Sequence, residues 1–209
     1  MLFDLHVHSS FSSCSRLCLD EILNKAQSRG LDGVCITDHD SMEARHWIKD
    51  GLQANGLCVI VGQEYTTRQG DFLLFGPYEH LLPGLSATRL LNHVRSTGGA
   101  AIAAHPFRAL RPVDEEILSS GLFRIIEEIN GRNTPFENSQ ASSWLERSPL
   151  CPVGGSDAHS LQELGRVPVR CDMPILSRAD LIQALHTPGC VSLAPPAPLV
   201  ESPAAASCA

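Results

Sequence analysis

The residues best suited to chemistry stand at the start of the chain, in the segment Asp4-Leu5-His6-Val7-His8. An extended strand points alternate side chains to opposite faces, so Asp4, His6 and His8 share one face while Leu5 and Val7 occupy the other. Two imidazoles two residues apart on one face can bind the same metal ion. Asp4, one step further back, could hold a ring N–H of a ligand histidine. The segment therefore predicts a strand that carries part of a metal site.

Four further clusters of the same residue types follow, each at or just after the end of a short apolar run. The clusters are Thr37-Asp38-His39-Asp40, Gly62-Gln63-Glu64, Ala104-His105-Pro106 and Gly155-Ser156-Asp157-Ala158-His159. Imidazole and carboxylate groups together suit zinc, manganese or iron. Their recurrence at strand ends predicts one shared metal centre.

The apolar runs alternate with segments of helical periodicity. Strands are predicted over 2–7, 33–37, 57–61, 72–75, 100–104, 123–129, 151–155 and 167–170, and helices over 20–29, 41–54, 86–96, 114–119, 135–147 and 178–186. The segment 68–71 has turn composition, which predicts a hairpin. This alternation indicates an α/β fold with a parallel sheet and its chemistry at the carboxyl ends of the strands.

Two architectures fit such an alternation. A doubly wound sheet would carry a glycine-rich phosphate loop, and neither G-x-G-x-x-G nor a P-loop is present. A closed, TIM-like barrel with a ring of ligands is the better interpretation. We expect one domain over residues 1–193 and a Pro- and Ala-rich tail without regular structure over 194–209.

Composition narrows the function classes. A formal net charge of −7 argues against a large nucleic-acid surface, which needs clustered Lys and Arg, and favours a small substrate. The sequence shows no bilayer-spanning apolar run and no secretory signal, so a cytoplasmic protein without a membrane partner is expected. The eight cysteines are scattered, and we interpret most of them as buried thiols in a reducing cytoplasm.

The order of these motifs carries a resemblance. His6-x-His8, Thr37-Asp38-His39, Gly62-x-Glu64, Ala104-His105-Pro106 and Gly155-Ser156-Asp157-Ala158-His159 resemble the successive motifs of the polymerase and histidinol phosphatase (PHP) superfamily. The resemblance covers residues 1 to about 170. It implies a distorted seven-stranded (β/α) barrel that holds two or three divalent metal ions and hydrolyses phosphate esters.

The resemblance also implies a ligand set. The first ion would take His6, His8, Glu64 and Asp157; the second would share Glu64 and add His105; the third would take His39 and His159. The identity of the ions, whether Zn, Mn or Fe, is left open by these donors.

Two positions depart from the pattern of the superfamily. Relatives often carry Asp or His five or six residues after the second histidine of the first motif, where this chain has Ser13 and Cys14. Cys14 could serve as a soft ligand of the third ion or be a plain buried thiol. Relatives also commonly place a histidine on the strand after the glutamate motif. Asp71 stands there in this chain, as a ligand or a turn residue, with His80 as the outside candidate.

Charged residues next to the motifs suggest further roles. Arg108 is predicted to clamp the phosphate, because a planar guanidinium can grip two oxygens at once. Arg16 and Arg132 are lesser candidates. Asp38 and Asp40 flank His39, and Asp40 also fits the start of a helix. In the expected mechanism, ions bridged by Glu64 activate a hydroxide, Arg108 neutralises the phosphate oxygens, and His159 or His39 protonates the leaving oxygen if its own ion is absent.

Three functions are therefore open. The first is a phosphoesterase acting on a small phosphorylated substrate, either a monoester such as histidinol phosphate or a nucleotide. The second is a 5′–3′ exonuclease on DNA or RNA, which the resemblance also implies for relatives. The third is a non-catalytic module that only binds metal. The departures from the superfamily pattern at Cys14 and Asp71 support this alternative.

Overall fold

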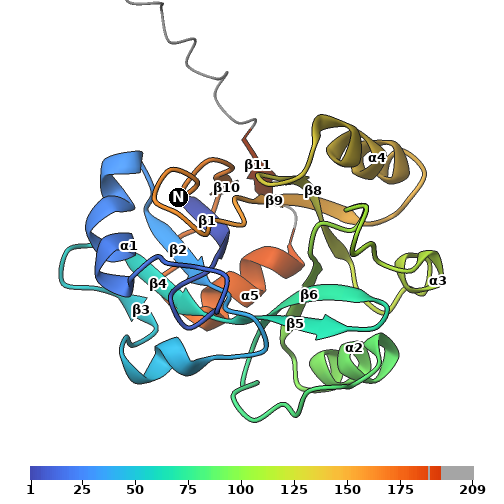
Figure 1. The fold of residues 1–209 in the computed structure, drawn as a ribbon, viewed down its shortest axis with the longest axis horizontal. Coiled ribbons are helices and arrows are strands. Elements are labelled where there is room, and N and C mark those ends of the chain that lie inside the picture. The colour runs from blue at the N-terminus through green and yellow to red at the C-terminus, as the bar shows by residue number, and fades with distance from the viewer. Residues whose placement is uncertain (188, 194–209) are drawn as a thin grey trace, which may run out of the picture.

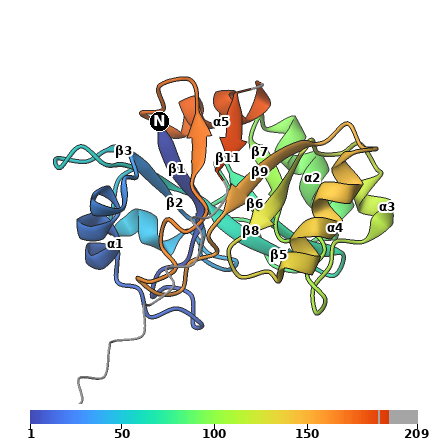
Figure 2. The same cartoon turned by 90° about the horizontal axis from the view of Figure 1, so that it is seen from above.

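The computed structural model describes residues 1–187 and 189–193. Its strands form two sheets, with most of the helices packed on their outer sides (Figure 1). The view from above separates the same two halves, with β1 and β2 in one and β7 and β8 in the other (Figure 2). The predicted α/β class is confirmed.

The first sheet has six strands in the order β11-β10-β1-β2-β4-β3. Its strands are β1 (Leu2–Val7), β2 (Gly33–Ile36), β3 (Gly51–Leu52), β4 (Cys58–Val61), β10 (Val169–Cys171) and β11 (Cys190–Ser192). β1, β2 and β4 run parallel, whereas β3, β10 and β11 extend the edges antiparallel. β2 and β4 are buried along their whole length, as expected of parallel strands covered on both faces.

The second sheet has five strands in the order β5-β6-β7-β8-β9. They are β5 (Gln63–Thr67), β6 (Gly70–Phe75), β7 (Ala100–Ala103), β8 (Ile125–Asn130) and β9 (Cys151–Gly155). β7, β8 and β9 run parallel. β5 and β6 form the predicted hairpin, but Asp71 lies on the strand opposite Thr66 and not in the turn.

A closed seven-stranded barrel is not confirmed. Among the described residues the strand ladders divide into two sheets, and only two isolated bridges, Val7 with Ala158 and His39 with Glu64, join them. The expectation of a parallel sheet was wrong for the edge strands β3, β10 and β11 and for the pairing of β6 with β7, which are antiparallel. A short apolar run reveals that a strand is buried but not the direction in which it pairs.

The helices are α1 (Leu19–Lys25), α2 (Ala87–Ser96), α3 (Glu115–Leu118), α4 (Pro135–Leu145) and α5 (Arg178–His186), with 3₁₀ turns at Gln27–Arg29 and Glu43–His46. The predicted N-cap of α2 is confirmed, since Ser86 accepts a hydrogen bond from the Arg89 N–H. α4 begins with a capping box made by Thr134 and Glu137. Local capping chemistry therefore sets where these two helices begin.

The predicted helix over 41–54 was wrong. Only the 3₁₀ turn Glu43–His46 forms, and the chain then pairs as β3 with β4. Asp50 accepts a hydrogen bond from the Val61 N–H at 2.7 Å, and Gly51 adopts a φ of 106°. These tertiary contacts outweigh a helical periodicity that spans nearly four turns.

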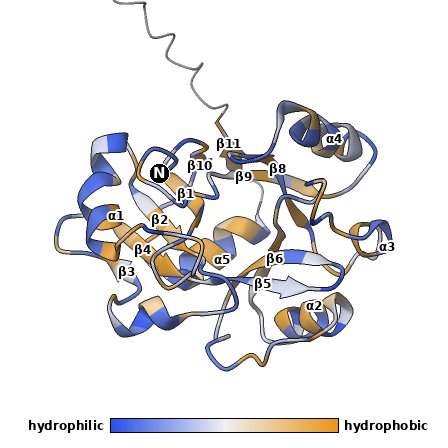
Figure 3. Cartoon of the chain, viewed as in Figure 1, coloured by the Kyte–Doolittle hydropathy of each residue, from blue (hydrophilic) through white to orange (hydrophobic). Residues whose placement is uncertain are grey.

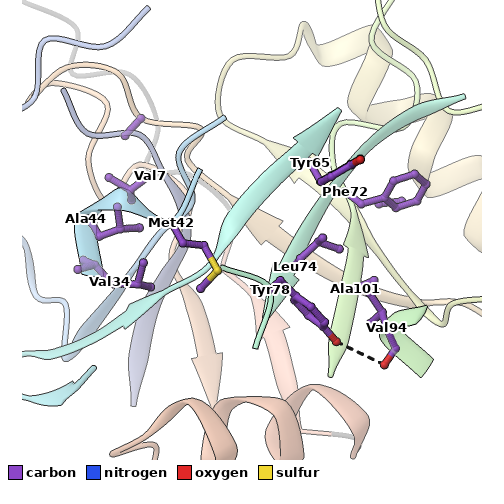
Figure 4. Packing of buried hydrophobic residues seen from close by; sticks show 14 of the residues in the cluster. Val7, Val34, Met42, Ala44, Tyr65, Phe72, Leu74, Tyr78, Val94 and Ala101 are labelled. Atoms are coloured by element: carbon purple, nitrogen blue, oxygen red, sulfur yellow. Dashed lines mark hydrogen bonds between the residues drawn. The ribbon is translucent and has the colours of Figure 1, made fainter. Parts of the chain in front are cut away.

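Apolar side chains pack in two clusters. Figure 3 shows that the hydrophobic residues concentrate on the strands and on the sides of the helices that face them. One cluster includes residues of both sheets and of α5; its largest members are Phe3, Leu5, Ile60, Leu73, Phe75 and Ile102. The other includes side chains of the outer helices. Figure 4 shows part of it, with Val34 on β2, Leu74 on β6 and the Tyr78 hydroxyl directed at the Val94 carbonyl. The helix α5 lies at the amino end of β7, where His186 Nε2 is 3.1 Å from the Gly99 carbonyl oxygen.

The cysteines differ from the expectation of mostly buried thiols. Cys35 and Cys58 are buried, whereas Cys14, Cys18 and Cys151 are exposed. Cys171 and Cys190 form a disulfide between β10 and β11, which are antiparallel neighbours. Sequence spacing alone did not reveal this pairing, because the two residues meet only through the sheet.

The predicted tail over 194–209 lies outside the described residues, and so does Cys208. None of the described helices combines the length and the apolar composition needed to cross a bilayer.

Candidate metal centre

Glu64 lies at the middle of the candidate site. Its Oε2 is 3.3 Å from His6 Nε2, 3.1 Å from His8 Nε2 and 3.1 Å from His39 Nδ1. Its Oε1 is 2.8 Å from His105 Nε2. The chain positions after β2, on β5 and after β7 are distant in sequence but adjacent at this end of the sheets. One buried carboxylate therefore faces imidazoles from two directions.

Asp157 occupies the other side of the same histidines. Its Oδ1 lies 3.6 Å from His6 Nε2, 3.4 Å from His8 Nε2 and 3.5 Å from His159 Nδ1. His6 Nε2 and His8 Nε2 are themselves only 3.0 Å apart. Two ring nitrogens directed at one point, with carboxylate oxygens around them, have the donor chemistry of a divalent metal site.

The ligand atoms fall into three groups that could each hold an ion. The groups are His6, His8 and Asp157; Glu64, Asp71 and His105; and His8, His39 and His159. In the second group, Asp71 Oδ2 and His105 Nδ1 are buried without a hydrogen-bond partner among the described residues. Buried polar atoms are normally satisfied, so an unpaired carboxylate oxygen here fits a ligand from outside the chain. The residues present thus fit divalent metal ions.

The backbone is strained where the site is built. Of the described residues other than glycine, only Asp40, His105 and Asp157 have a positive φ, at 49°, 32° and 53°. Such conformations are uncommon for residues that carry a Cβ and gather at functional sites. Two of the three residues carry candidate ligand groups.

The charges of the site hold its acids ionised. Burial would raise the pKa of Glu64, but His6 and the hydrogen bonds from His105 and His8 lower it well below its usual value. Burial and the neighbouring His8 lower the pKa of His159 to about 4. Glu64 is therefore an anion and His159 a neutral imidazole at neutral pH, which are the forms that bind metal.

Asp71, and not His80, lies with the candidate ligands. It is 1% exposed, and its Oδ1 accepts a hydrogen bond from Arg111 at 3.0 Å. Burial and the charge of Glu64 raise the pKa of Asp71 to about 6. His80 lies in a turn and belongs to none of the three groups.

Cys14 lies at the third group. Its Sγ is 3.2 Å from His159 Nε2, and the residue is exposed and not a buried thiol. Ser13 is exposed as well and has no part in the three groups.

Glu127 is a functional residue that sequence reasoning missed. Its Oε1 is 2.8 Å from His6 Nδ1, and its Oε2 accepts hydrogen bonds from the His105 N–H at 2.7 Å and from Asn130 at 2.8 Å. The signal was present, because Glu127 is an acid inside the apolar run of β8. It orients one candidate ligand and the backbone of another.

The role expected of Asp4 was wrong. Its carboxylate accepts the N–H groups of Ser156 and Gly165 at 3.1 and 2.8 Å and does not bond to an imidazole. The register of β1 on β2 shifts between Asp4 and Val7, so strict alternation does not hold along this strand. Asp4 instead secures the backbone around Asp157.

The acids beside His39 accept hydrogen bonds from backbone N–H groups and from serine hydroxyls. Asp38 accepts hydrogen bonds from Ser9 and from Ser12 Oγ at 2.6 Å, and Ser12 Oγ lies 3.2 Å from His8 Nδ1. Asp40 begins no helix, contrary to the expectation; its Oδ1 accepts the Thr66 N–H at 2.8 Å. Asp38 therefore positions His8 through Ser12.

Arginines line the site. Arg108 donates to Asp157 Oδ2 at 2.7 Å, to Asn130 Oδ1 at 2.8 Å and to Asn133 Oδ1 at 2.9 Å. Arg132 Nη1 lies 2.9 Å from His159 Nδ1. Arg16 is exposed and contacts none of the candidate ligands, whereas Arg111, which sequence reasoning missed, reaches Asp71.

Fold and site together define an α/β protein with a candidate metal centre at the carboxyl ends of its parallel strands. Residues 4–129 match the sequence model of the PHP domain, and residues 135–187 match that of the PHP-associated family. The chain belongs to the PHP domain family. Two of its relatives are named probable phosphatases.

Individual relatives are distant. A probable phosphatase of Caldicellulosiruptor bescii is 24% identical over 199 residues, which cover 78% of this chain and 82% of that protein. The crystal structure of PsfC from Pseudomonas syringae is similar with a TM-score of 0.73 at 19% identity, covering 92% of this chain and 91% of that one. The lesion-specific endonuclease PfuEndoQ from Pyrococcus furiosus has a TM-score of 0.69 at 18% identity, covering 92% of this chain and 58% of that one. At these identities the two structures support the fold alone.

Proposed function

We propose that this protein is a metal-dependent phosphoesterase that hydrolyses a small phosphorylated substrate. The observation that carries the proposal is the position of Glu64, whose Oε2 faces three imidazoles at 3.1–3.3 Å and whose Oε1 faces the His105 imidazole at 2.8 Å. A carboxylate so placed can bridge two ions. Probable phosphatases among the relatives support the same activity.

The proposed ligand set follows the three groups. His6, His8 and Asp157 would hold one ion together with Glu64, whose Oε2 lies 3.3 and 3.1 Å from the Nε2 atoms of His6 and His8. Glu64, His105 and Asp71 would hold a second. His8, His39 and His159 face the third position, with Cys14 beside His159. Divalent ions bound there would supply Lewis acidity, activating water and neutralising phosphate oxygens.

The chain itself would bind and orient the phosphate through Arg108. Asn130, Asn133 and Asp157 fix its guanidinium, so that little side-chain entropy is lost when it meets the substrate. The Arg108 side chain is 23% exposed, so it can be reached from solvent. A planar guanidinium at this position would stabilise negative charge on the phosphoryl oxygens.

His159 fits a ligand better than an acid. With a pKa of about 4 it carries no proton to donate at neutral pH. We therefore assign it to the third metal position, and the leaving oxygen would take its proton from solvent.

A nuclease is the second candidate. The likeness to an endonuclease whose structure holds a 27-mer duplex favours it, as do Arg108, Arg111 and Arg132 around the site. Against it stands the net charge of −7.

The third candidate, a module that binds metal without catalysis, predicts metal content without turnover.

One set of assays separates the three candidates. The purified protein with added Mn²⁺ is tested on p-nitrophenyl phosphate and on an end-labelled oligonucleotide, and its metal content is measured. We expect the protein to hydrolyse the monoester. Glu64→Gln should abolish both this activity and metal retention. Glu43→Gln, which changes an exposed acid, should alter neither. An active Glu64→Gln protein with normal metal content would refute the proposal.

A further inference from the structure

A cavity lies away from the candidate ligands. It has a volume of about 570 Å³ and is lined by α3, the end of α4 and the segments that lead into β8 and β9. These segments enter the amino ends of the parallel strands, whereas the metal centre lies at their carboxyl ends. A volume of this size is typical of sites for small molecules.

The floor of the cavity is apolar and its edge is cationic. Leu118 and Phe123 are buried in its wall, and Trp144 adds an aromatic ring. Arg124 and Arg147 are exposed at the edge, where Glu115 is the one acid among the lining residues that the structure describes. Such a surface is complementary to a ligand with a ring and a negative charge.

Among the described residues, neither of these two arginines forms an ion pair. The arginine ion pairs of the described residues are made by Arg108, Arg111, Arg132, Arg170 and Arg178. Both guanidinium groups line the same cavity and both residues are exposed, so each is available to an incoming anion. An anion that enters would meet both charges at once.

Trp144 gives a further, independent indication of a ligand. The Arg147 guanidinium carbon lies 5.9 Å from the centre of its ring, within the range of a cation–π contact. The indole Nε1 is buried and has no acceptor among the described residues. A buried N–H without an acceptor is costly, so Trp144, one of the residues that line the cavity, carries an unused donor.

We infer that this cavity binds a small aromatic anion, such as an aromatic carboxylate, at a site separate from the metal centre. The ring of the ligand would pack on Phe123 and Trp144, and its negative group would lie between Arg124 and Arg147. The inference does not depend on the proposed phosphoesterase activity.

The test uses tryptophan fluorescence of the full-length protein. The chain has two tryptophans, so Trp47→Phe leaves Trp144 as the sole reporter. Three probes are titrated: 4-nitrobenzoate, neutral 4-nitrobenzyl alcohol, and acetate, which lacks a ring. We expect saturable quenching by 4-nitrobenzoate and at least tenfold weaker binding of the other two.

Variants locate the binding. Arg124→Gln with Arg147→Gln should raise the Kd for 4-nitrobenzoate at least tenfold, while Arg89→Gln, an exposed arginine on α2, and Arg108→Gln leave it unchanged. For the protein that keeps both Arg124 and Arg147, the Kd for 4-nitrobenzoate should also rise at about 1 M salt, where charges are screened within about 3 Å. Quenching that does not saturate, equal affinity for the alcohol, or weakening by Arg108→Gln alone would overturn the inference.

Discussion

Glu127 is the residue on which two of the candidate ligands depend. Its two oxygens contact the His6 ring and the His105 backbone, and all three residues are buried. Residues that orient ligands in this way change metal affinity by about 10–100-fold when altered. Sequence reasoning identified the ligands themselves, because histidines and acids at strand ends stand out, but not the acid that orients them from inside a strand.

We therefore predict that Glu127→Gln weakens metal binding by about 10–100-fold, because an amide cannot offer both oxygens as acceptors. Competition with a fluorescent chelator measures the affinity. Glu128→Gln is the matched control, since Glu128 contacts Ser142 and not a candidate ligand. Equal affinities of the two variants would show that Glu127 does not position the site.

The thiols should differ in reactivity as they differ in surroundings. Burial raises the pKa of the Cys35 thiol well above its usual value, and partial burial also raises the pKa of the exposed Cys14 thiol. In a Cys208→Ser background we predict rapid labelling of Cys18 and Cys151 at about pH 8, slower labelling of Cys14, and labelling of Cys35 only on unfolding. If Cys14 is a ligand, added Zn²⁺ slows its labelling alone; mass spectrometry of peptides resolves each site. Uniform labelling with and without Zn²⁺ would remove Cys14 from the ligand set.

At the scale of elements, the strands that carry the site were predictable and the connection after His39 was not. The apolar runs of β2, β4 and β7 and the N-cap of α2 are local signals, and the structure confirms them. The segment 41–54 has helical periodicity, but the Asp50 contact with β4 decides its course. A contact between residues distant in sequence leaves no trace in the local pattern.

Close packing of β9 against β1 and β8 leads to a prediction for Gly155. A Cβ on this residue would collide with Glu127 Oε1 and His6 Cβ. Gly155→Ala should therefore lower the free energy of unfolding by about 1–3 kcal/mol and weaken metal binding as well. Gly30→Ala, in the left-handed turn after α1 with open space around it, should cost about 1 kcal/mol without affecting the metal. Chemical denaturation and chelator competition give the two readouts, and unchanged metal affinity in Gly155→Ala would count against this packing argument.

For the whole molecule, metal binding should contribute to stability. An ion at about 100 times its Kd stabilises the folded state by about 2.7 kcal/mol, which corresponds to roughly 5–10 °C in Tm for a protein of this size. We predict that a chelator lowers the Tm of the purified protein by this amount and that Zn²⁺ or Mn²⁺ restores it. Calorimetry on the Glu64→Gln variant is the control, because its Tm should not respond to the chelator. A wild-type Tm that ignores the chelator would contradict a bound ion in the native protein.

The two isolated bridges have a consequence for how the protein opens. Val7 pairs with Ala158, and His39 pairs with Glu64, so the sheets meet at the very positions that surround the candidate ligands. Cations bound there would connect the two sheets at this end, while α5 and the apolar core hold them together at the other end. Without bound cations, the N–H groups of His8 and Glu64, which donate to the carbonyls of Ala158 and Asp38 between the two sheets, should exchange with deuterium well before those of β2 and β8. Loss of metal would then first separate the two sheets locally at this end, with each sheet still intact.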